Sequence, residues 1–162
     1  MRLAKRMTRN LKNTQEKSLR QRALEYLGKR EYSAFELANK LKTYADEADD
    51  IPVLITDFKE RGWLSDARFT EHIVRVRQVK FGSAKIANEL REKGVSEELI
   101  TEAVSEVRAS ELENAAEVWR KKYNQIASDR NEWAKQARFL QSRGFGFDTI
   151  KQVLKAAEND ND

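Results

Sequence analysis

The sequence contains no cysteine, one proline and one histidine among its 162 residues. Without cysteine, disulfides and thiolate metal sites are excluded. The single His72 has no second histidine with which to build a zinc site, so we interpret it as a helix-surface or half-buried side chain rather than a metal ligand. No apolar run approaches the length that spans a bilayer, so we expect no membrane insertion. We also expect no cofactor and no bound metal.

Charge is unevenly distributed along the chain. Charged residues make up 36% of the sequence and the net charge is +4. The first 22 residues hold eight basic residues against one acidic residue, and the remainder is slightly acidic. Such a basic arm suits nucleic acid or an acidic protein surface, because each cation that meets a phosphate releases a condensed counterion. A solvated, disordered tail is the alternative reading.

Glycine and proline are scarce, and apolar residues recur at helical spacing almost everywhere after Lys17. Ser33 and Glu36 form a capping box that predicts the start of one helix. Pro52 suits the first turn of the next helix, and Gly62 is placed to end it. The sequence therefore predicts an all-α fold.

Apolar stripes mark three successive sets of helices. The first set is marked by Leu24, Leu27, Tyr32, Leu37, Leu41, Ile51, Leu54, Ile55 and Phe58. The second is marked by Phe69, Ile73, Val76, Ile86, Leu90, Ile100, Ala103, Val104 and Val107. The third is marked by Ala115, Val118, Trp119, Trp133, Ala137, Leu140, Ile150, Val153 and Leu154.

The three sets are copies of one pattern. Residues 36–41 (ELANKL) align with residues 85–90 (KIANEL), which lie 49 positions later. A shift of 50 positions relates the second set to the third. The residues matched by that second shift include Leu90, Lys93 and Gly94 with Leu140, Arg143 and Gly144. Self-similarity at such a period is the mark of a repeat architecture.

A unit of this size is too small to be very stable alone, so neighbouring units should share apolar surface. The sequence predicts tandem repeats of three-helix units in an elongated arrangement, whose curvature is left open, with a one-sided surface suited to an extended partner. The predicted parts are a basic arm at 1–22, partly disordered or helical, three-helix repeats at 23–65, 66–108 and 109–158, and an acidic tail at 159–162.

Catalytic patterns are missing from the sequence. It has no phosphate-cradling glycine loop, no nucleophile elbow and no paired histidine and carboxylate on a helix face. The acidic residues mostly lie near lysine or arginine, as on a solvated helix surface. We therefore predict no catalytic residue and no enzymatic activity.

Residues 68–93 hold seven basic residues against three acidic ones, on both sides of the Phe81-Gly82-Ser83 turn. That turn can also present backbone N–H groups. We interpret the segment as a patch for phosphate or for a carboxylate-rich protein face. The alternative is that lysine and arginine simply favour a helix C-terminus. Lys135, Arg138 and Arg143 extend the patch into the third set.

The aromatic residues divide into two groups. Trp63, Trp119, Trp133, Phe69 and Phe139 fall on apolar stripes, so we interpret them as core rather than as platforms for base stacking. The role of the three phenylalanines next to glycines, Phe81, Phe145 and Phe147, stays open.

Three segments resemble the RecX family. Residues 62–69 (GWLSDARF) are similar to its signature of glycine, an aromatic residue, leucine, two acidic residues and Arg-Phe. Residues 75–96 are similar to its central segment, with an Arg-x-Arg pair, Lys-Phe-Gly, Ile-x-x-Glu-Leu and a Lys-Gly ending. Residues 139–145 (FLQSRGF) resemble its C-terminal motif. Two positions depart from the family pattern. Ser65 stands where the family usually has the first of the two acidic residues, and Ser83 stands where it often has proline.

The resemblance implies tandem three-helix repeats that bind in the groove of the RecA–DNA filament. It implies inhibition of RecA's ATP hydrolysis, strand exchange and co-protease activity, and hence a role in recombinational repair and the SOS response. It further implies a cytoplasmic monomer that binds single- and double-stranded DNA weakly and in a salt-dependent way. The candidate contacts with RecA or DNA are Arg68, Arg75, Arg77, Lys80, Lys85, Arg91, Lys93, Lys135, Arg138 and Arg143.

Two other readings remain open on the sequence alone. A helix-turn-helix regulator could act on duplex DNA independently of RecA, since basic three-helix units are compatible with that function. No helix combines asparagine, glutamine and arginine into a clear recognition face, which counts against it. A purely structural helical adaptor is the third reading.

Overall fold

The structure is a computed structural model that describes residues 17–160. Most of the predicted basic arm and the last two residues of the predicted acidic tail lie outside the described residues. Every regular element within 17–160 is a helix, which confirms the all-α prediction. The helices are α2 (Leu19–Lys29), α3 (Ala34–Lys42), α4 (Ile51–Glu60), α5 (Asp66–Arg77), α6 (Ser83–Glu92), α7 (Glu97–Ala109), α8 (Glu111–Lys122), α9 (Arg130–Ser142) and α10 (Phe147–Asn159).

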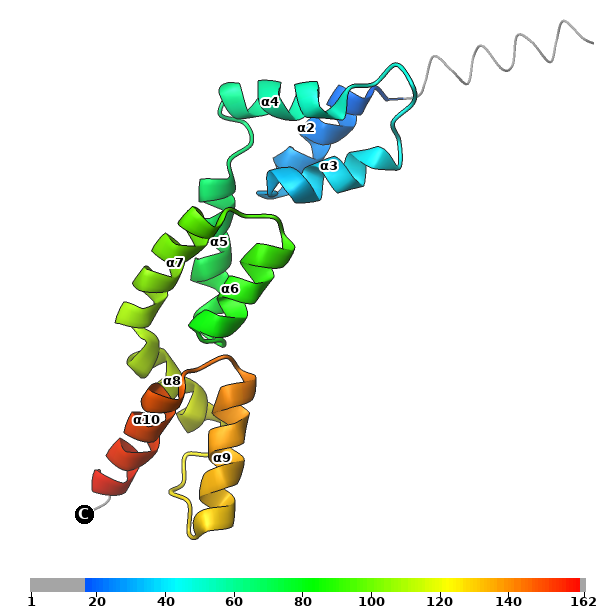
Figure 1. Ribbon diagram of the computed structural model, residues 1–162. Coiled ribbons are helices and arrows are strands. Elements are labelled where there is room, and N and C mark those ends of the chain that lie inside the picture. Colours follow the sequence, from blue (N-terminus) through cyan, green and yellow to red (C-terminus); the bar gives the residue numbers. More distant parts are fainter. Residues whose placement is uncertain (1–16, 161–162) are drawn as a thin grey trace, which may run out of the picture. The chain divides into compact units, whose positions relative to one another are not determined.

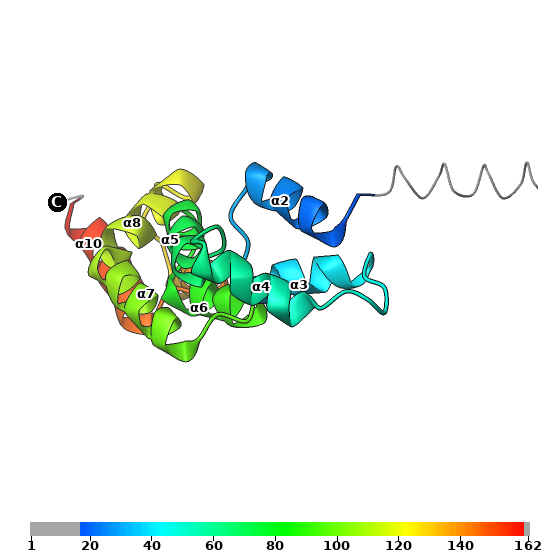
Figure 2. The same cartoon turned by 90° about the horizontal axis from the view of Figure 1, so that it is seen from above.

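The described chain divides into two compact units, and the boundary between them in the sequence lies between Ser65 and Asp66. The first unit is the three-helix set α2 to α4, in which α3 packs against both α2 and α4 (Figure 1, Figure 2). Its buried core consists of Leu19, Ala23, Tyr32, Leu37, Leu41, Phe58 and Leu64. The first helix begins at Leu19, so the end of the predicted basic arm is helical.

Local capping explains where the first helices begin. The Ser18 hydroxyl accepts a hydrogen bond from the Gln21 amide and the Gln21 side chain accepts one from the Ser18 amide, which completes a capping box. The predicted cap at Ser33 is present, because its hydroxyl accepts from the Glu36 amide at 3.1 Å. Asp50 caps α4, and Pro52 lies in its first turn as predicted.

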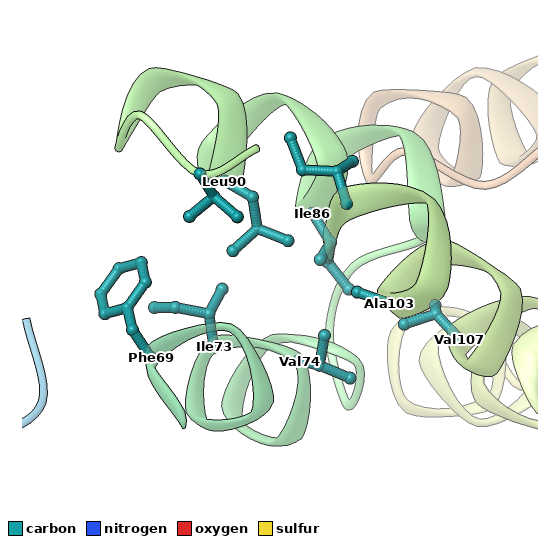
Figure 3. Close-up of a cluster of buried hydrophobic side chains, with 9 residues drawn as sticks. Phe69, Ile73, Val74, Ile86, Leu90, Ala103 and Val107 are labelled. Carbon is teal, nitrogen blue, oxygen red and sulfur yellow. The ribbon is translucent and has the colours of Figure 1, made fainter. Parts of the chain in front are cut away.

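The second unit contains the other two three-helix sets, joined through contacts between α7 and α8. In the first of them α5 and α6 both pack against α7. Figure 3 shows Phe69, Ile73 and Val74 of α5 pointing toward residues of α6 and α7. The full buried cluster is Phe69, Ile73, Val74, Ile86, Leu90, Val95, Ile100, Ala103 and Val107.

The last set consists of α8, α9 and α10, with α10 packed against both other helices. Its buried core is Ala115, Ala137, Leu140, Phe145, Ile150, Val153 and Leu154. Each set therefore has its own apolar cluster, and tandem three-helix units are confirmed. None of the helices within 17–160 is long and apolar enough to cross a bilayer.

The repeat seen in the sequence is also a repeat of backbone conformation. Gly94 and Gly144 follow α6 and α9 with φ of +71° and +89°, a region that residues with a Cβ rarely adopt. The next residue turns back in both copies, because the amides of Val95 and Phe145 bond to carbonyls of the preceding helix. Phe145 is thus the counterpart of Val95, and both are buried. This places Phe145 in the core.

Three predicted core positions are wrong. Leu24 and Val76 are 40% and 45% exposed, and their places in the core are taken by Ala23 and Val74. Trp63 is 41% exposed. Its ring packs edge-on against Phe58, with centroids 5.4 Å apart, and is flanked by two guanidinium groups. At Leu24 and Val76, neighbouring apolar residues compete for one helix face, and periodicity does not settle which of them is buried. Trp63 lies in the loop between α4 and α5, where the next residue, Leu64, is the one that is buried.

Gln136 stands in the third set where the second has Ile86, and it is buried. Its carbonyl accepts a hydrogen bond from Trp119 Nε1 at 2.8 Å, and its amide nitrogen donates to the Gln125 carbonyl at 3.1 Å. Both ends of the amide are therefore paired, which is the condition for burying such a group. The same bond holds Trp119 between α8 and α9.

Replacing Phe58 by Ala is expected to destabilise the first unit by about 3–5 kcal/mol, because the side chain is fully buried and leaves a cavity. Hydrogen-exchange protection of the α3 and α4 amides measures the loss. Phe35→Ala is the matched control, since Phe35 is 53% exposed and should change stability by less than about 0.5 kcal/mol. Equal loss of protection in both variants would contradict the assigned core.

Candidate binding surface

The turn between α5 and α6 packs directly against the turn after α9 (Figure 1). The Gly82 amide donates to the Arg143 carbonyl at 2.8 Å, and the Ala84 amide donates to the Gly144 carbonyl at 3.3 Å. A Cβ on Gly82 would lie 2.4 Å from the Gly144 oxygen, and one on Gly144 would lie 2.6 Å from the Lys85 Cβ. Backbone therefore touches backbone here, and only glycine permits it. We call this contact the joint.

A buried carboxylate completes the joint. Glu111, the first residue of α8, is 7% exposed and accepts hydrogen bonds from the Ser83 amide at 2.9 Å and the Ser83 hydroxyl at 3.0 Å. The N-cap residue of α6 is Gly82, which has no side chain to offer. Glu111 therefore supplies from the third set the cap that α6 lacks. Its negative charge also lies at the favourable end of the α6 dipole.

These contacts correct one expectation from the sequence. The amides of the turn were predicted to be available to an anionic partner. Instead, the amides of Gly82, Ser83 and Ala84 bond to groups of the third set, and the Phe81 amide bonds to the Arg77 carbonyl. The reason is that the turn lies inside a contact between two sets, which local sequence does not reveal. Binding at this surface must therefore use side chains.

Two cations from different sets meet around the half-buried ring of Phe81. Lys85 Nζ lies 4.5 Å from the ring centroid, and the guanidinium carbon of Arg143 lies 5.5 Å from it. The same guanidinium is 5.2 Å from the Phe139 ring, so Arg143 is held by two aromatic rings. Within residues 17–160 neither cation forms an ion pair. We call Phe81, Lys85 and Arg143 the joint cluster.

Lys85 lies at the opposite end of its helix from the position that basic residues favour. It lies in the first turn of α6, where a cation opposes the helix dipole. The preference of basic residues for a helix C-terminus explains Arg75 and Arg143, but it does not explain Lys85. Lys85 is therefore exposed at a position where its charge does not stabilise its own helix.

A groove of about 530 Å³ begins at Phe81 and runs along α6. It brings together three of the candidate cations, which are Arg77, Lys85 and Lys93. Asn88, Glu89 and Glu92 also line it, so the groove carries both signs of charge. Phe81 and Lys85 line the groove and also belong to the joint cluster.

Two candidate residues already have carboxylate partners. The Arg77 guanidinium donates to both oxygens of Glu89, at 2.9 Å each from Nη2 and Nε, and this hydrogen bonding raises the pKa of Arg77. Arg91 donates to both oxygens of Glu97, which raises the pKa of Arg91 and lowers that of Glu97. These two arginines chiefly connect helices, so they are weaker candidates than their charge suggested.

The other candidates lie around this centre. Lys80 is exposed in the turn, immediately before Phe81. Arg75 is exposed at the end of α5, with Nη2 3.4 Å from His72 Nδ1. Lys135 and Arg138 are exposed on α9, and Lys135 occupies the register that Lys85 has in the second set. Arg68 is exposed in the first turn of α5. Lys135 and Arg138 are not among the cations that lie at the Phe81 ring.

Comparison with known proteins places the chain in a family. A family model described as the second three-helix domain of RecX matches residues 65–104, and the model of the third matches residues 109–154. The regulatory protein RecX of Leptothrix cholodnii is 42% identical over 150 residues, which cover 93% of this chain and 96% of that protein. This chain belongs to the RecX family. The regulatory protein RecX of Neisseria meningitidis serogroup C is 38% identical, over 90% and 95% of the two chains.

Solved RecX structures share the fold. The crystal structure of RecX from Lactobacillus salivarius superposes with a TM-score of 0.77 and 22% identity, over 86% of this chain and 94% of that one. A second crystal structure of a regulatory protein RecX gives a TM-score of 0.71 and 20% identity, over 83% and 70%. The named relatives are regulatory proteins, and the fold is a helical repeat.

Sequence reasoning missed Glu111, which was grouped with the solvated surface carboxylates. Nothing in the local sequence separates it from its neighbours, because its burial depends on a turn 28 residues away. The signal was at Ser83, where RecX proteins often have proline. A proline has no N–H to donate, so it could not make the amide bond to Glu111, and the hydroxyl bond to Glu111 requires a side chain such as that of Ser83. Within 17–160, no three metal-ligating side chains are grouped to hold an ion.

Proposed function

We propose that this RecX protein binds the RecA–DNA filament and inhibits RecA's ATPase, recombinase and co-protease activities, thereby modulating recombinational repair and the SOS response. It carries out no reaction of its own in this proposal. RecA is the partner that the family name implies, and DNA in the filament is the second. The protein acts as a monomer through weak, salt-dependent contacts.

The observation that carries the proposal is the joint cluster. Phe81 and Lys85 come from the second three-helix set and Arg143 comes from the third, and Glu111 with two glycines holds the sets together at that point. Cations that are fixed on a scaffold lose less side-chain entropy on binding than cations on a mobile chain. A surface built across two repeats also suits a partner that is itself a repeating polymer.

The proposal is tested by RecA's ATPase activity on single-stranded DNA, with this protein added before or after filament assembly. We expect inhibition in both orders, and its relative strength separates blocked growth from induced disassembly. ATP hydrolysis that is unaffected at saturating protein in both orders would contradict the proposal.

A titration against bare duplex DNA addresses the helix-turn-helix alternative. A regulator independent of RecA should bind a preferred duplex sequence in the nanomolar range, whereas a filament-binding protein should bind bare DNA weakly and lose affinity steeply with salt. Tight, sequence-selective duplex binding without RecA would favour the alternative.

A further inference from the structure

The joint cluster exists only when two three-helix sets are held together. The second set supplies Phe81 and Lys85, and the third supplies Arg143. Arg143 is the C-cap residue of α9 and its carbonyl accepts the Gly82 amide, so the joint fixes its backbone against the turn that carries Phe81. Neither set alone contains a site with both cations beside one aromatic ring.

The chemistry of the cluster fits a phosphodiester with an unstacked base. The guanidinium of Arg143 is oriented by two rings, and a planar, oriented guanidinium binds phosphate oxygens through paired N–H donors. Lys85 adds an ammonium at the Phe81 ring, 4.5 Å from its centroid. A half-buried phenylalanine at the mouth of a groove offers surface for a base, and base–aromatic stacking tolerates any sequence.

A single strand fits this arrangement better than a duplex. In a duplex the bases are stacked on one another, so a ring that is half-buried between two cations would meet only the sugar–phosphate backbone. In a single strand one base can leave the stack and rest on the ring while the flanking phosphates reach Lys85 and Arg143. An acidic protein segment would use the cations but would gain nothing specific from Phe81.

We propose that the joint cluster is a binding site for single-stranded nucleic acid, and that Glu111 is the positioning residue that assembles it by holding the third set against the start of α6. This deepens the proposed function, on which its biological meaning rests, because it assigns this part of the surface to the filament's DNA rather than to RecA. Glu111 itself does not contact the strand, since its oxygen is buried and bonded to Ser83.

The site is tested with the full-length chain and a fluorescent oligodeoxythymidine, by anisotropy titration at several salt concentrations without RecA. Arg143→Gln and Lys85→Gln should each weaken binding about fivefold at 0.1 M salt and reduce the salt slope by about 0.7, the value for one lost phosphate contact on a single strand. Lys155→Gln is the matched control, because it removes the same charge from an exposed position of α10. Equal losses in all three variants would mean that net charge alone acts, and would overturn the site.

The positioning role is tested by a double-mutant cycle. Glu111→Ala should weaken binding about as much as Arg143→Gln, and the double variant should be little worse than either, because both changes remove one interaction. Glu111→Gln keeps a carbonyl acceptor for Ser83 and should restore most of the affinity. Additive losses in the double variant, or no loss in Glu111→Ala, would overturn the positioning role.

Failure of the nucleic-acid site and failure of the proposed function would give different results in these experiments. If Arg143→Gln binds the oligonucleotide normally but inhibits RecA poorly, the cluster contacts protein and the nucleic-acid site is wrong, while the proposed function stands. If the unaltered chain binds the oligonucleotide through the cluster but leaves RecA's ATPase unaffected, the site stands and the proposed function fails.

Discussion

Reversing Lys80, Lys85 and Arg143 together to Glu is expected to abolish inhibition of RecA's DNA-dependent ATPase while leaving the helical content unchanged. Lys85 and Arg143 lie at the Phe81 ring, Lys80 immediately precedes Phe81 in the chain, and none of the three forms an ion pair within the described residues. Their reversal turns an attraction to phosphate into a repulsion at the centre of the surface. Arg77 is left in place, because its bonds to Glu89 hold α5 to α6.

The control variant carries the same change in net charge at another place. Arg108, Lys151 and Lys155 are exposed on α7 and α10 and are not members of the joint cluster. Their triple reversal to Glu should retain most of the inhibition at 0.1–0.2 M salt, because it leaves Phe81, Lys85 and Arg143 unchanged and salt screens exposed charges over about 10 Å. Circular dichroism checks folding in both variants. Undiminished inhibition by the variant at the joint would rule out this surface.

Substituting Gly144 by Ala is expected to open the joint. The residue has φ of +89°, and a side chain in the left-handed region costs about 1–2 kcal/mol. The added Cβ would also lie 2.6 Å from the Lys85 Cβ and 2.7 Å from the Lys85 amide nitrogen. Relieving that overlap costs about 1–3 kcal/mol more, or moves the two turns apart. We therefore expect both lower stability of the second unit and loss of RecA inhibition.

The neighbouring glycine provides a close comparison. A Cβ added to Gly146 would have nothing within 4 Å, and its φ of −71° is ordinary for any residue. Gly146→Ala should therefore cost no more than about 1 kcal/mol, the loss of a favoured N-cap residue, and leave inhibition intact. Urea unfolding followed by circular dichroism, with the ATPase assay in parallel, compares the two. If Gly144→Ala behaves like Gly146→Ala, the close contact at the joint is not present in solution.

Most of the fold could be predicted because it depends on local and periodic features. Helical spacing, the caps at Ser33 and Ser96, and the left-handed glycines at 94 and 144 each act within a few residues. The internal repeat added to this evidence, because the helix positions predicted in one set could be checked against the aligned positions of the other two. The errors at Leu24 and Val76 arose where two apolar neighbours compete for one face, which is decided only by packing.

The candidate surface could be predicted only as a list of charges. Net charge identified Lys85 and Arg143, but not that they lie at one ring, because that follows from a contact between residues about sixty positions apart. Charge counting also could not show that Arg77 and Arg91 are bonded to carboxylates. The burial of Glu111 could not be predicted either, because it depends on contact with Ser83, which is 28 residues away in the sequence. Local sequence indicates which segments form helices, whereas the ion-pair partners and the burial of a side chain depend on how the helices pack together.

The second and third three-helix sets must act as one surface if the joint cluster is to bind anything, and a distance measurement tests this most directly. The chain has no cysteine, so spin labels on Ser105→Cys in α7 and Gln152→Cys in α10 are unique. Double electron–electron resonance should give one narrow distance distribution, which broadens when Glu111→Ala or Gly144→Ala is added. A broad distribution in the otherwise unaltered chain, or one that neither substitution changes, would show that the joint does not hold the two sets together.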